Sequence, residues 1–323
     1  MSALDYRGAR AMVLGASGFI GRWVARRLTA EGAAPILVVR NPVTVRGETM
    51  IADLAVPGVA ARLIGQANPD IVFNLAGYGV DPTERDEALS YRMNAELVEE
   101  VADACAGLPS QENWRGLRLV HAGSVLEYGA IQGIVTEDSL PNPTTLYGRT
   151  KLAGTNRLTR LAQQRGLPSV TARLLQVVGP GEHPGRLLPL LLEAARHPGS
   201  APIPFSHGAQ RHDFTYVGDV AEGLLRLGQC PAAALLPPPG KVVNLGTGFL
   251  STARDFIETA ATILGVPDWK LQFGALPSRT EEMQYEAVRV ERLRLLLDWL
   301  PNPKIEDIVH RSVRFLAEVA DEN

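Results

Sequence analysis

The chain has 323 residues, of which 46% are hydrophobic, so it can build a large packed core. Its formal net charge is −3, with acidic and basic residues interspersed, which argues against nucleic acid or an anionic membrane surface as a partner. No stretch approaches the roughly 20 apolar residues that span a bilayer, and no basic-then-apolar export signal begins the chain. We expect a soluble, cytoplasmic protein.

The potential metal ligands are sparse. Cys105 and Cys230 lie far apart, and we predict two free thiols, buried or half-buried. His183, His207 and His212 have no metal-ligand spacing and are typical of polar loops. The sequence therefore predicts no metal site.

The first half of the chain alternates β-branched runs with amphipathic segments of helical length. In chain order, strands are predicted at 10–14, 35–39, 49–51, 71–75, 117–121 and 170–175. Helices are predicted at 20–31, 87–105 and 147–165. This rhythm indicates a parallel sheet covered on both faces, with a ligand crevice at the carboxyl ends of its strands.

The rhythm breaks after Arg173, where stretches rich in proline and glycine separate short elements. A helix is predicted at 187–196, a strand and helix that rejoin the main sheet at 214–227, a further strand at 241–245, and an amphipathic helix at 305–318. We predict a dinucleotide domain of residues 1–175, rejoined by about 213–248. A smaller substrate lobe is predicted from 176–212 and 249–323.

A glycine-rich turn links the first strand to the first helix. Gly15 permits a tight turn, Gly18 lets the backbone approach a pyrophosphate, and Gly21 allows the helix to pack closely on the strand. The helix N-terminus supplies free N–H groups to the phosphates. The predicted dinucleotide contacts in this turn are Gly15, Ser17, Gly18, Phe19, Ile20 and Gly21.

The end of the second strand distinguishes the two nicotinamide cofactors. An NAD site usually has Asp or Glu there for the ribose, whereas this strand ends in Arg40 with no carboxylate. A guanidinium matches a phosphate, so Arg40 favours the 2′-phosphate of NADP, with NAD as the alternative. Asp53 and Leu54 are expected to meet the adenine, and Ala76 and Gly77 to allow close backbone approach.

Three side chains form the predicted catalytic group. Tyr147 and Lys151 lie one turn apart on the same face of a helix. A nearby ammonium favours the phenolate and is expected to move the tyrosine pKa toward working pH. Ser124, just past the fifth strand, is placed at the crevice edge to hold a substrate oxygen.

With these motifs the chain resembles an extended short-chain dehydrogenase/reductase, the type that includes nucleotide-sugar epimerases, dehydratases and 4-ketoreductases. The resemblance covers nearly the whole chain, in order. Further stretches that carry it are Asn74-Leu75-Ala76-Gly77, Asn94, Arg173 with Gly179-Pro180-Gly181, Asp213-Phe214-Thr215-Tyr216-Val217-Gly218-Asp219, Asn244-Leu245-Gly246-Thr247-Gly248 and Leu297-Asp298-Trp299-Leu300-Pro301. It implies an α/β fold: a Rossmann-type doubly wound parallel sheet with a smaller, discontinuous C-terminal substrate lobe.

The resemblance also implies roles for individual residues. Tyr147 is the expected acid–base catalyst, Lys151 holds the nicotinamide ribose, and Ser124 orients the substrate carbonyl or hydroxyl. Leu75 and Asn94 join the cofactor site, where Asn94 supports the backbone rather than the chemistry.

Departures from the family pattern narrow the reaction. Members that dehydrate at C4 and C6 carry an acidic pair directly after the Ser/Thr position, but here Val125 and Leu126 follow. Glu127 is next, and strand alternation would turn it away from Ser124. Members that epimerise at C3 and C5 use a cysteine near this loop, whereas Cys105 lies in the preceding helix. Of the reactions in this family, simple hydride transfer is the one that these residues still allow.

The substrate side departs further. The family arginine that meets the substrate diphosphate is His212 here, with Arg211 one position earlier and pointing the opposite way on an extended segment. Gln176 replaces the usual asparagine. Arg279, followed by Glu281 and Glu282, resembles the late residues that grip phosphate and ribose.

The leading hypothesis is an NADP-dependent nucleotide-sugar 4-ketoreductase. An NAD-dependent 4-epimerase is the enzyme alternative, and a dinucleotide-sensing regulatory protein is the alternative without catalysis. The resemblance also implies a homodimer through helices 87–105 and 147–165, and the apolar Leu97, Val98, Val101 and Ala104 suit either that pairing or packing on the sheet.

Overall fold

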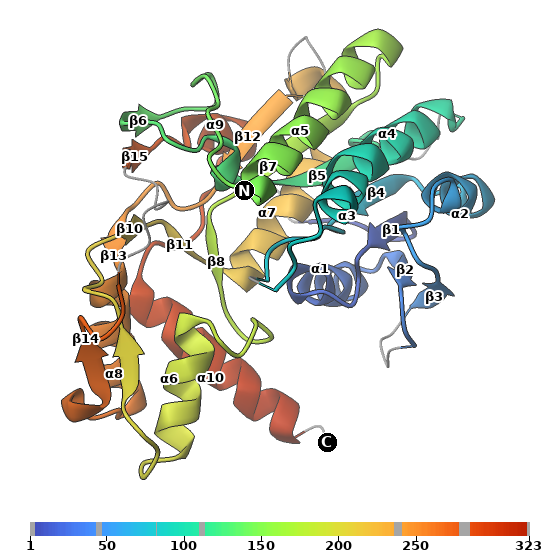
Figure 1. Ribbon diagram of the computed structural model, residues 1–323. Coiled ribbons are helices and arrows are strands. Elements are labelled where there is room, and N and C mark those ends of the chain that lie inside the picture. Colours follow the sequence, from blue (N-terminus) through green and yellow to red (C-terminus); the bar gives the residue numbers. More distant parts are fainter. Residues whose placement is uncertain are drawn as a thin grey trace.

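The computed structural model describes residues 4–42, 47–81, 83–109, 114–235, 241–277 and 285–321. Seven parallel strands form its main sheet (Figure 1). In spatial order they are β12 (Lys241–Leu245), β7 (Ser169–Leu174), β5 (Leu119–Ser124), β4 (Ile71–Asn74), β1 (Arg10–Leu14), β2 (Ala34–Val39) and β3 (Glu48–Ile51). The order reverses direction at β1 and β4, so their carboxyl ends form the crevice where dinucleotides bind in such sheets. The predicted fold class is confirmed.

Helices cover both faces of this sheet because alternate strand residues point to opposite sides. On one face lie α1 (Phe19–Ala30) and α7 (Val217–Gln229), packed on Val13, Phe73 and Val120. On the other lie α2 (Val59–Ala67), α4 (Leu97–Gly107) and α5 (Leu146–Arg165), packed on Met12, Val72 and Leu119. These buried runs explain why the strands are nearly continuous in apolar residues.

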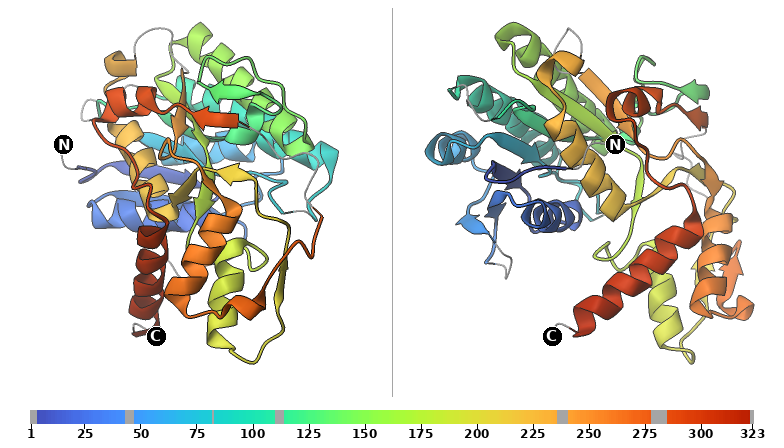
Figure 2. Two further views of the ribbon diagram at one scale, coloured as in Figure 1. Left: turned by 90° about the vertical axis from the view of Figure 1, so that its left-hand side faces the viewer. Right: turned by 180° about the vertical axis from the view of Figure 1, so that it is seen from behind.

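A smaller assembly of C-terminal elements has its own core, built around Leu191, Phe256 and Ile308. In both views of Figure 2 this assembly lies below the main sheet. Its elements are α6 (Leu187–Arg196), β9 (Ile203–Phe205), α8 (Ala253–Leu264), β14 (Leu271–Phe273) and α10 (Ile305–Asp321). The division of the chain into a dinucleotide domain and a substrate lobe at the predicted boundaries stays a prediction.

Short pairs of strands connect the two parts. They are β8 (Gln176–Val178) with β11 (Phe214–Tyr216), β10 (Arg211–His212) with β13 (Ser251–Thr252), and β6 (Gly133–Val135) with β15 (Tyr285–Val288). Short helical segments complete the description: Val125–Glu127, Ala232–Leu235, Asp268–Lys270 and α9 (Glu291–Leu297).

Two predicted elements differ from those observed in their pairing or in their type of helix. The strand at 214–216 does not rejoin the main sheet. It pairs with β8, which follows the point after Leu174 where the chain leaves that sheet. Helix α7, in contrast, does pack on the face of the main sheet. The helix predicted at 87–105 is α3 (Glu87–Tyr91), a π-helical segment Arg92–Glu96, and α4. That π segment carries Asn94, whose side chain is tied to neighbouring elements.

The fifth strand lies further along the chain than predicted. It runs to Ser124 because His121-Ala122-Gly123-Ser124 pairs with β7 residue by residue. Both cysteines are free and buried, as predicted. No described helix is long and apolar enough to cross a membrane.

Candidate functional site

The glycine turn has the geometry of a dinucleotide cradle. Gly15 has φ +77°, and a Cβ there would lie 2.9 Å from the backbone nitrogen of Ala76, so only glycine fits. A Cβ on Gly21 would overlap the carbonyl of Gly15. Ser17 and Gly18 are exposed at the mouth of the turn, while Phe19 and Ile20 pack against the C-terminal core. These residues fit a bound pyrophosphate at the N-terminus of α1.

The predicted adenosine contacts lie on the segments after β2 and β3. Arg40 follows the buried end of β2, is exposed, and forms no ion pair with any described residue. The Asp53 carboxylate accepts a hydrogen bond from the Ala55 backbone nitrogen (3.0 Å), and Leu54 is buried. Arg92 holds the Leu54 carbonyl at 3.1 Å.

Asn94 ties the segment after β4 to helix α5. Its side-chain nitrogen donates to the Tyr78 carbonyl (2.7 Å) and the Thr150 hydroxyl (3.0 Å), and its oxygen accepts from the Tyr78 backbone nitrogen (3.0 Å). Leu75, Ala76 and Gly77 precede this clamp at the edge of the crevice. Asn94 therefore supports the backbone, in the role that the resemblance implied.

Ser124 ends β5 and caps the short helical turn that follows. Its hydroxyl accepts from the Leu126 backbone nitrogen (3.2 Å), and its own backbone nitrogen donates to Glu127 (2.8 Å). The expectation that Glu127 turns away from Ser124 is wrong. The strand stops at Ser124, and the helical turn Val125–Glu127 brings the carboxylate back.

Glu127 belongs to a buried ion pair. Its carboxylate accepts from the Arg173 Nε at 2.8 Å, and the two side chains are 0% and 3% exposed. The Arg173 guanidinium also lies 4.2 Å from the centre of the Tyr128 ring. Each carboxylate oxygen thus accepts from a fixed donor, and Glu127 holds the backbone of Ser124 in place.

Tyr147 stands in the first turn of α5. Thr145 caps the helix by accepting from the Gly148 nitrogen (3.0 Å), and Gly148 packs so tightly on the Leu126 carbonyl that no larger residue fits. The Tyr147 ring also lies against Gly79. The first turn of α5 is therefore seated directly on the loop that carries Ser124.

The pKa of Tyr147 is raised, not lowered as expected. Burial is the main cause, followed by the negative charges of Glu127 and Glu84, and Arg186 opposes them. The Lys151 ammonium donates instead to the Ala122 carbonyl at 2.5 Å. In the protein alone, Tyr147 is thus a protonated phenol, which suits a general acid.

Lys151 is buried (3% exposed), and burial lowers its pKa to about 8, an effect that Glu127 partly offsets. Since Glu127 acts on both Lys151 and Tyr147 and bonds to Ser124, the three predicted catalytic residues surround one carboxylate. The structure brings them together at the carboxyl end of β5.

A pH dependence follows from Lys151. Its folded-state pKa of about 8 lies below the ordinary value of 10.5, so its ammonium is lost as pH rises through about 8. If the ammonium is needed for turnover, kcat/KM should fall above that pH. Between pH 8 and 10.5 the unfolded chain binds more protons, so this group makes the free energy of unfolding increase with pH. A pH–rate profile that stays flat to pH 10 would contradict the role of Lys151.

The predicted substrate residues that the structure describes lie on two short strands, Gln176 in β8 and Arg211 and His212 in β10. His212 is partly buried, and burial with the charge of Arg186 lowers its pKa to about 4, so it is neutral near pH 7. Arg211 is exposed and donates weakly to the Leu250 carbonyl (3.4 Å), and Gln176 lies half-buried in β8. Arg279, Glu281 and Glu282 lie outside the described residues.

Arg186 was missed by sequence reasoning. It stands at the start of α6, pairs with Glu182 at 3.4 Å, and its charge acts on both Tyr147 and His212. Glu182 is almost fully buried, and its pKa is raised by burial to about 7. The only signal in the sequence was that both residues follow Gly179-Pro180-Gly181 closely.

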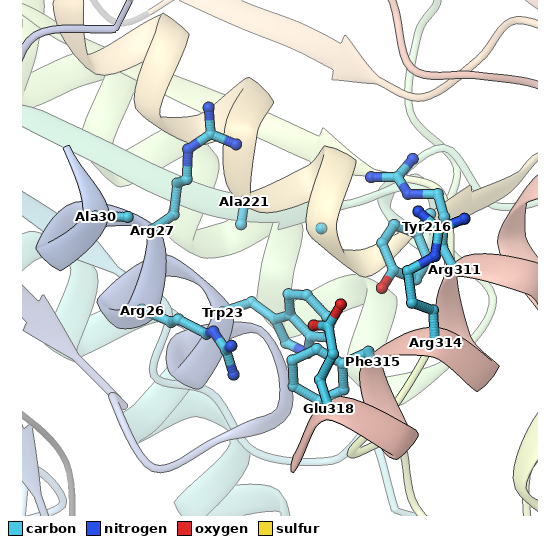
Figure 3. A pocket seen from close by; sticks show the side chains of 11 residues that line it. Trp23, Arg26, Arg27, Ala30, Tyr216, Ala221, Arg311, Arg314, Phe315 and Glu318 are labelled. Carbon is cyan, nitrogen blue, oxygen red and sulfur yellow. The ribbon is translucent and has the colours of Figure 1, made fainter. Parts of the chain in front are cut away.

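A separate pocket of about 300 Å³ lies between α1, α7 and α10 (Figure 3). The Arg26 guanidinium stacks on Phe315 (4.9 Å), and Trp23 donates to the Pro180 carbonyl (3.0 Å). It contains none of the predicted catalytic or cofactor residues. Through the bond from Trp23 to Pro180, the aromatic side chains of this pocket hold the Gly179-Pro180-Gly181 loop.

A model of the NAD dependent epimerase/dehydratase family matches residues 11–246. The chain belongs to this family. Its members are NAD(P)-dependent oxidoreductases and epimerases that modify nucleotide sugars, and the predicted resemblance is confirmed.

Similar proteins within the epimerase/dehydratase family span nearly the whole chain. A dTDP-6-deoxy-L-talose 4-dehydrogenase (NAD(P)(+)) of Kitasatospora kifunensis is 32% identical over 321 residues, 96% of both chains. A UDP-glucose 4-epimerase of Mycolicibacterium smegmatis is 25% identical and covers 95% of this chain and 98% of its own. The structure of MoeE5 in complex with UDP-glucose and NAD superposes with a TM-score of 0.81 at 24% identity, covering 97% of this chain and 100% of that one.

Proposed function

We propose that this protein is an NADP-dependent ketoreductase that interconverts a 4-keto nucleotide sugar and its 4-hydroxy product. The observation that carries the proposal is the placement of Tyr147 in the first turn of α5, seated on the loop of Ser124 and one turn before Lys151, because reduction of a ketone needs a general acid. The similarity to a 4-dehydrogenase over 96% of the chain supports the same chemistry, and it favours a dTDP-6-deoxyhexose as substrate.

In this proposal the nicotinamide, when bound, supplies or accepts the hydride. Ser124 orients the substrate oxygen, and Tyr147 donates its phenolic proton to that oxygen during reduction. Lys151, fixed by the Ala122 carbonyl, holds the ribose and places a positive charge near the phenol. Val125 and Leu126 bring only apolar side chains to this end of the site, which leaves no group for 4,6-dehydration.

The enzyme alternative is a 4-epimerase, which the similarity to a UDP-glucose 4-epimerase favours. An epimerase returns the hydride to its substrate and keeps its cofactor, whereas a ketoreductase exchanges it each turnover. Purified protein that is free of nicotinamide and oxidises NADPH stoichiometrically with a 4-keto nucleotide sugar would support the ketoreductase. Retained cofactor with no change in nicotinamide absorbance during turnover would support the epimerase, and cofactor binding with no turnover would support a sensing protein.

Arg40 is the proposed determinant of NADP preference. Replacing Arg40 with alanine should weaken NADPH binding by about 10- to 100-fold, since a charge-assisted hydrogen bond is worth about 1.5–3 kcal/mol. NADH has no 2′-phosphate, so its affinity in the same variant is the matched control and should change little. Titration of each cofactor by fluorescence measures both; an equal loss for NADH would contradict the assignment.

On the substrate side, Arg186 is the best-placed cation for the anionic part of a nucleotide sugar, because the neutral His212 cannot supply that charge. Gln176, Arg211 and Arg279 remain proposed substrate contacts. In this proposal Arg186, at the start of α6, supplies the positive charge that His212 lacks relative to the family pattern.

We also propose that the protein forms a homodimer through α4 and α5. The stripe of Leu97, Val98 and Val101 packs on the sheet, so it is not available for that pairing. The outer surface of the two helices instead carries Glu99, bound by Arg157 (2.6 Å) and Arg160 (2.5 Å). Light scattering should give twice the mass of one chain, and a monomer at working concentration would exclude the dimer.

A further inference from the structure

Three polar side chains lie in one row across the centre of the main sheet. Asn74 of β4 is the register partner of His121 of β5, which in turn is the partner of Thr171 of β7. All three are 0% exposed. They point to the sheet face that α4 and α5 cover, because side chains alternate along a strand and their chain neighbours Phe73, Val120 and Ala172 belong to the core on the opposite face.

Helix α5 adds a fourth polar group above this row. Thr155 lies four residues after Lys151, so the two side chains share one face of the helix. The bond from the Lys151 ammonium to the Ala122 carbonyl shows that this face rests on the sheet. Thr155 is 2% exposed, one helical turn deeper in the core than Lys151.

Within the part of the chain that the structure describes, these four side chains have no hydrogen bond of normal geometry, and only a weak interaction links the His121 ring to the backbone of Asn74. The unpaired atoms are Asn74 Oδ1 and Nδ2, His121 Nδ1 and Nε2, Thr155 Oγ1 and Thr171 Oγ1. Buried polar atoms without partners are rare and destabilising in folded proteins, and buried water commonly supplies the missing bonds. These four side chains, on neighbouring elements, form a polar cluster in an otherwise apolar layer.

The polar cluster lies next to Lys151, the predicted catalytic lysine. His121 directly precedes Ala122, whose carbonyl accepts from Lys151. Burial first, and then the Lys151 charge, hold the pKa of His121 well below its usual value, against a weaker backbone interaction with Asn74. The Glu127 carboxylate raises the pKa of Lys151, against the larger effect of burial. His121 is therefore a neutral imidazole with one acceptor nitrogen, and Lys151 has three donors of which Ala122 takes one.

We propose that Asn74, His121, Thr155 and Thr171 hold bound water behind Lys151, and that His121 is a positioning residue that stabilises the lysine ammonium through this water. The link to catalysis rests on the proposed function, because it acts through Lys151. The binding of water and the state of Lys151 do not depend on which sugar is the substrate.

The test compares wild-type protein with His121→Phe, which fills the site with an apolar ring. Carbon NMR of the Lys151 side chain, assigned by its loss in Lys151→Arg, reports the lysine pKa without any substrate. We expect His121→Phe to lower that pKa by about one pH unit or more, because the ammonium loses polar solvation. Thr171→Val, which changes only a hydroxyl to a methyl, should shift it in the same direction by less.

His310→Phe is the matched control, since His310 is exposed on α10 and should leave the Lys151 pKa unchanged. If His121 only fills space, His121→Phe would leave the Lys151 pKa within error of wild type, and the proposal fails. If His121→Phe does not fold, Thr155→Val and Thr171→Val together carry the same test. An unchanged lysine pKa in His121→Phe, with a wild-type protein that reduces a 4-keto nucleotide sugar, would overturn this proposal alone. A shifted lysine pKa in that variant, with a wild-type protein that has no such activity, would overturn only the ketoreductase.

Discussion

Replacing Tyr147 with phenylalanine should lower kcat by about 10²- to 10⁴-fold, the range expected when a general acid is removed. The ring keeps its contact with Gly79 and the helix keeps its Thr145 cap, so the protein should fold and bind NADPH as before. Stopped-flow or steady-state oxidation of NADPH measures the first effect, and cofactor titration the second.

The matched control is Tyr6→Phe. Tyr6 is a fully buried tyrosine whose hydroxyl donates to the Leu225 carbonyl (2.7 Å) on the face of the sheet away from Lys151. This variant should lose about 1 kcal/mol of stability and keep its kcat. Turnover of Tyr147→Phe within tenfold of wild type would rule out Tyr147 as the acid.

The second large effect is expected on stability. Replacing Glu127 with alanine leaves the Arg173 guanidinium buried without its carboxylate, which should cost about 3–5 kcal/mol in the free energy of unfolding. It also removes the acceptor for the Ser124 backbone nitrogen, so kcat should fall as well. Urea unfolding followed by circular dichroism measures the stability change.

Two controls bracket this result. Glu127→Leu with Arg173→Met replaces both charges by apolar groups of similar size and should recover most of the lost stability, although not the kcat. Glu258→Ala removes the carboxylate of an exposed ion pair with Arg254 (3.1 Å) and should cost less than about 1 kcal/mol. An equally small cost for Glu127→Ala would mean that the buried pair does not stabilise the fold.

The sequence predicted the strands of the main sheet and the glycine turn because both depend on local patterns. Arg10–Leu14 is buried from Ala11 onward, and Gly15 and Gly21 of the turn are required by close backbone contacts. Leu187–Arg196 was also predicted with its observed bounds, because its apolar residues recur at helical spacing.

The errors came from long-range pairing. β5 extends through the small residues Gly123 and Ser124 only because β7 lies beside them, and β11 pairs with β8 rather than with the main sheet. No local pattern encodes either partner. The π segment around Asn94 likewise depends on bonds to Tyr78 and Thr150, which are distant in sequence.

The same distinction holds at the site. The proximity of Ser124, Tyr147 and Lys151 could be predicted because their spacing and family context are distinctive, while their catalytic roles stay a prediction. The raised pKa of Tyr147 could not, because it depends on Glu127 and Glu84 brought in by other segments. Arg186 and His121 were missed for the same reason, since each is defined by its neighbours across the fold.

The most direct test of the proposed function is reduction of a dTDP-4-keto-6-deoxyhexose with NADPH that carries deuterium at the transferable position. Mass spectrometry and proton NMR then locate the label. The ketoreductase proposal predicts one deuterium at C4 of the product sugar and one NADPH consumed per sugar reduced. A product inverted at C4 without deuterium, or with no NADPH consumed, would contradict it.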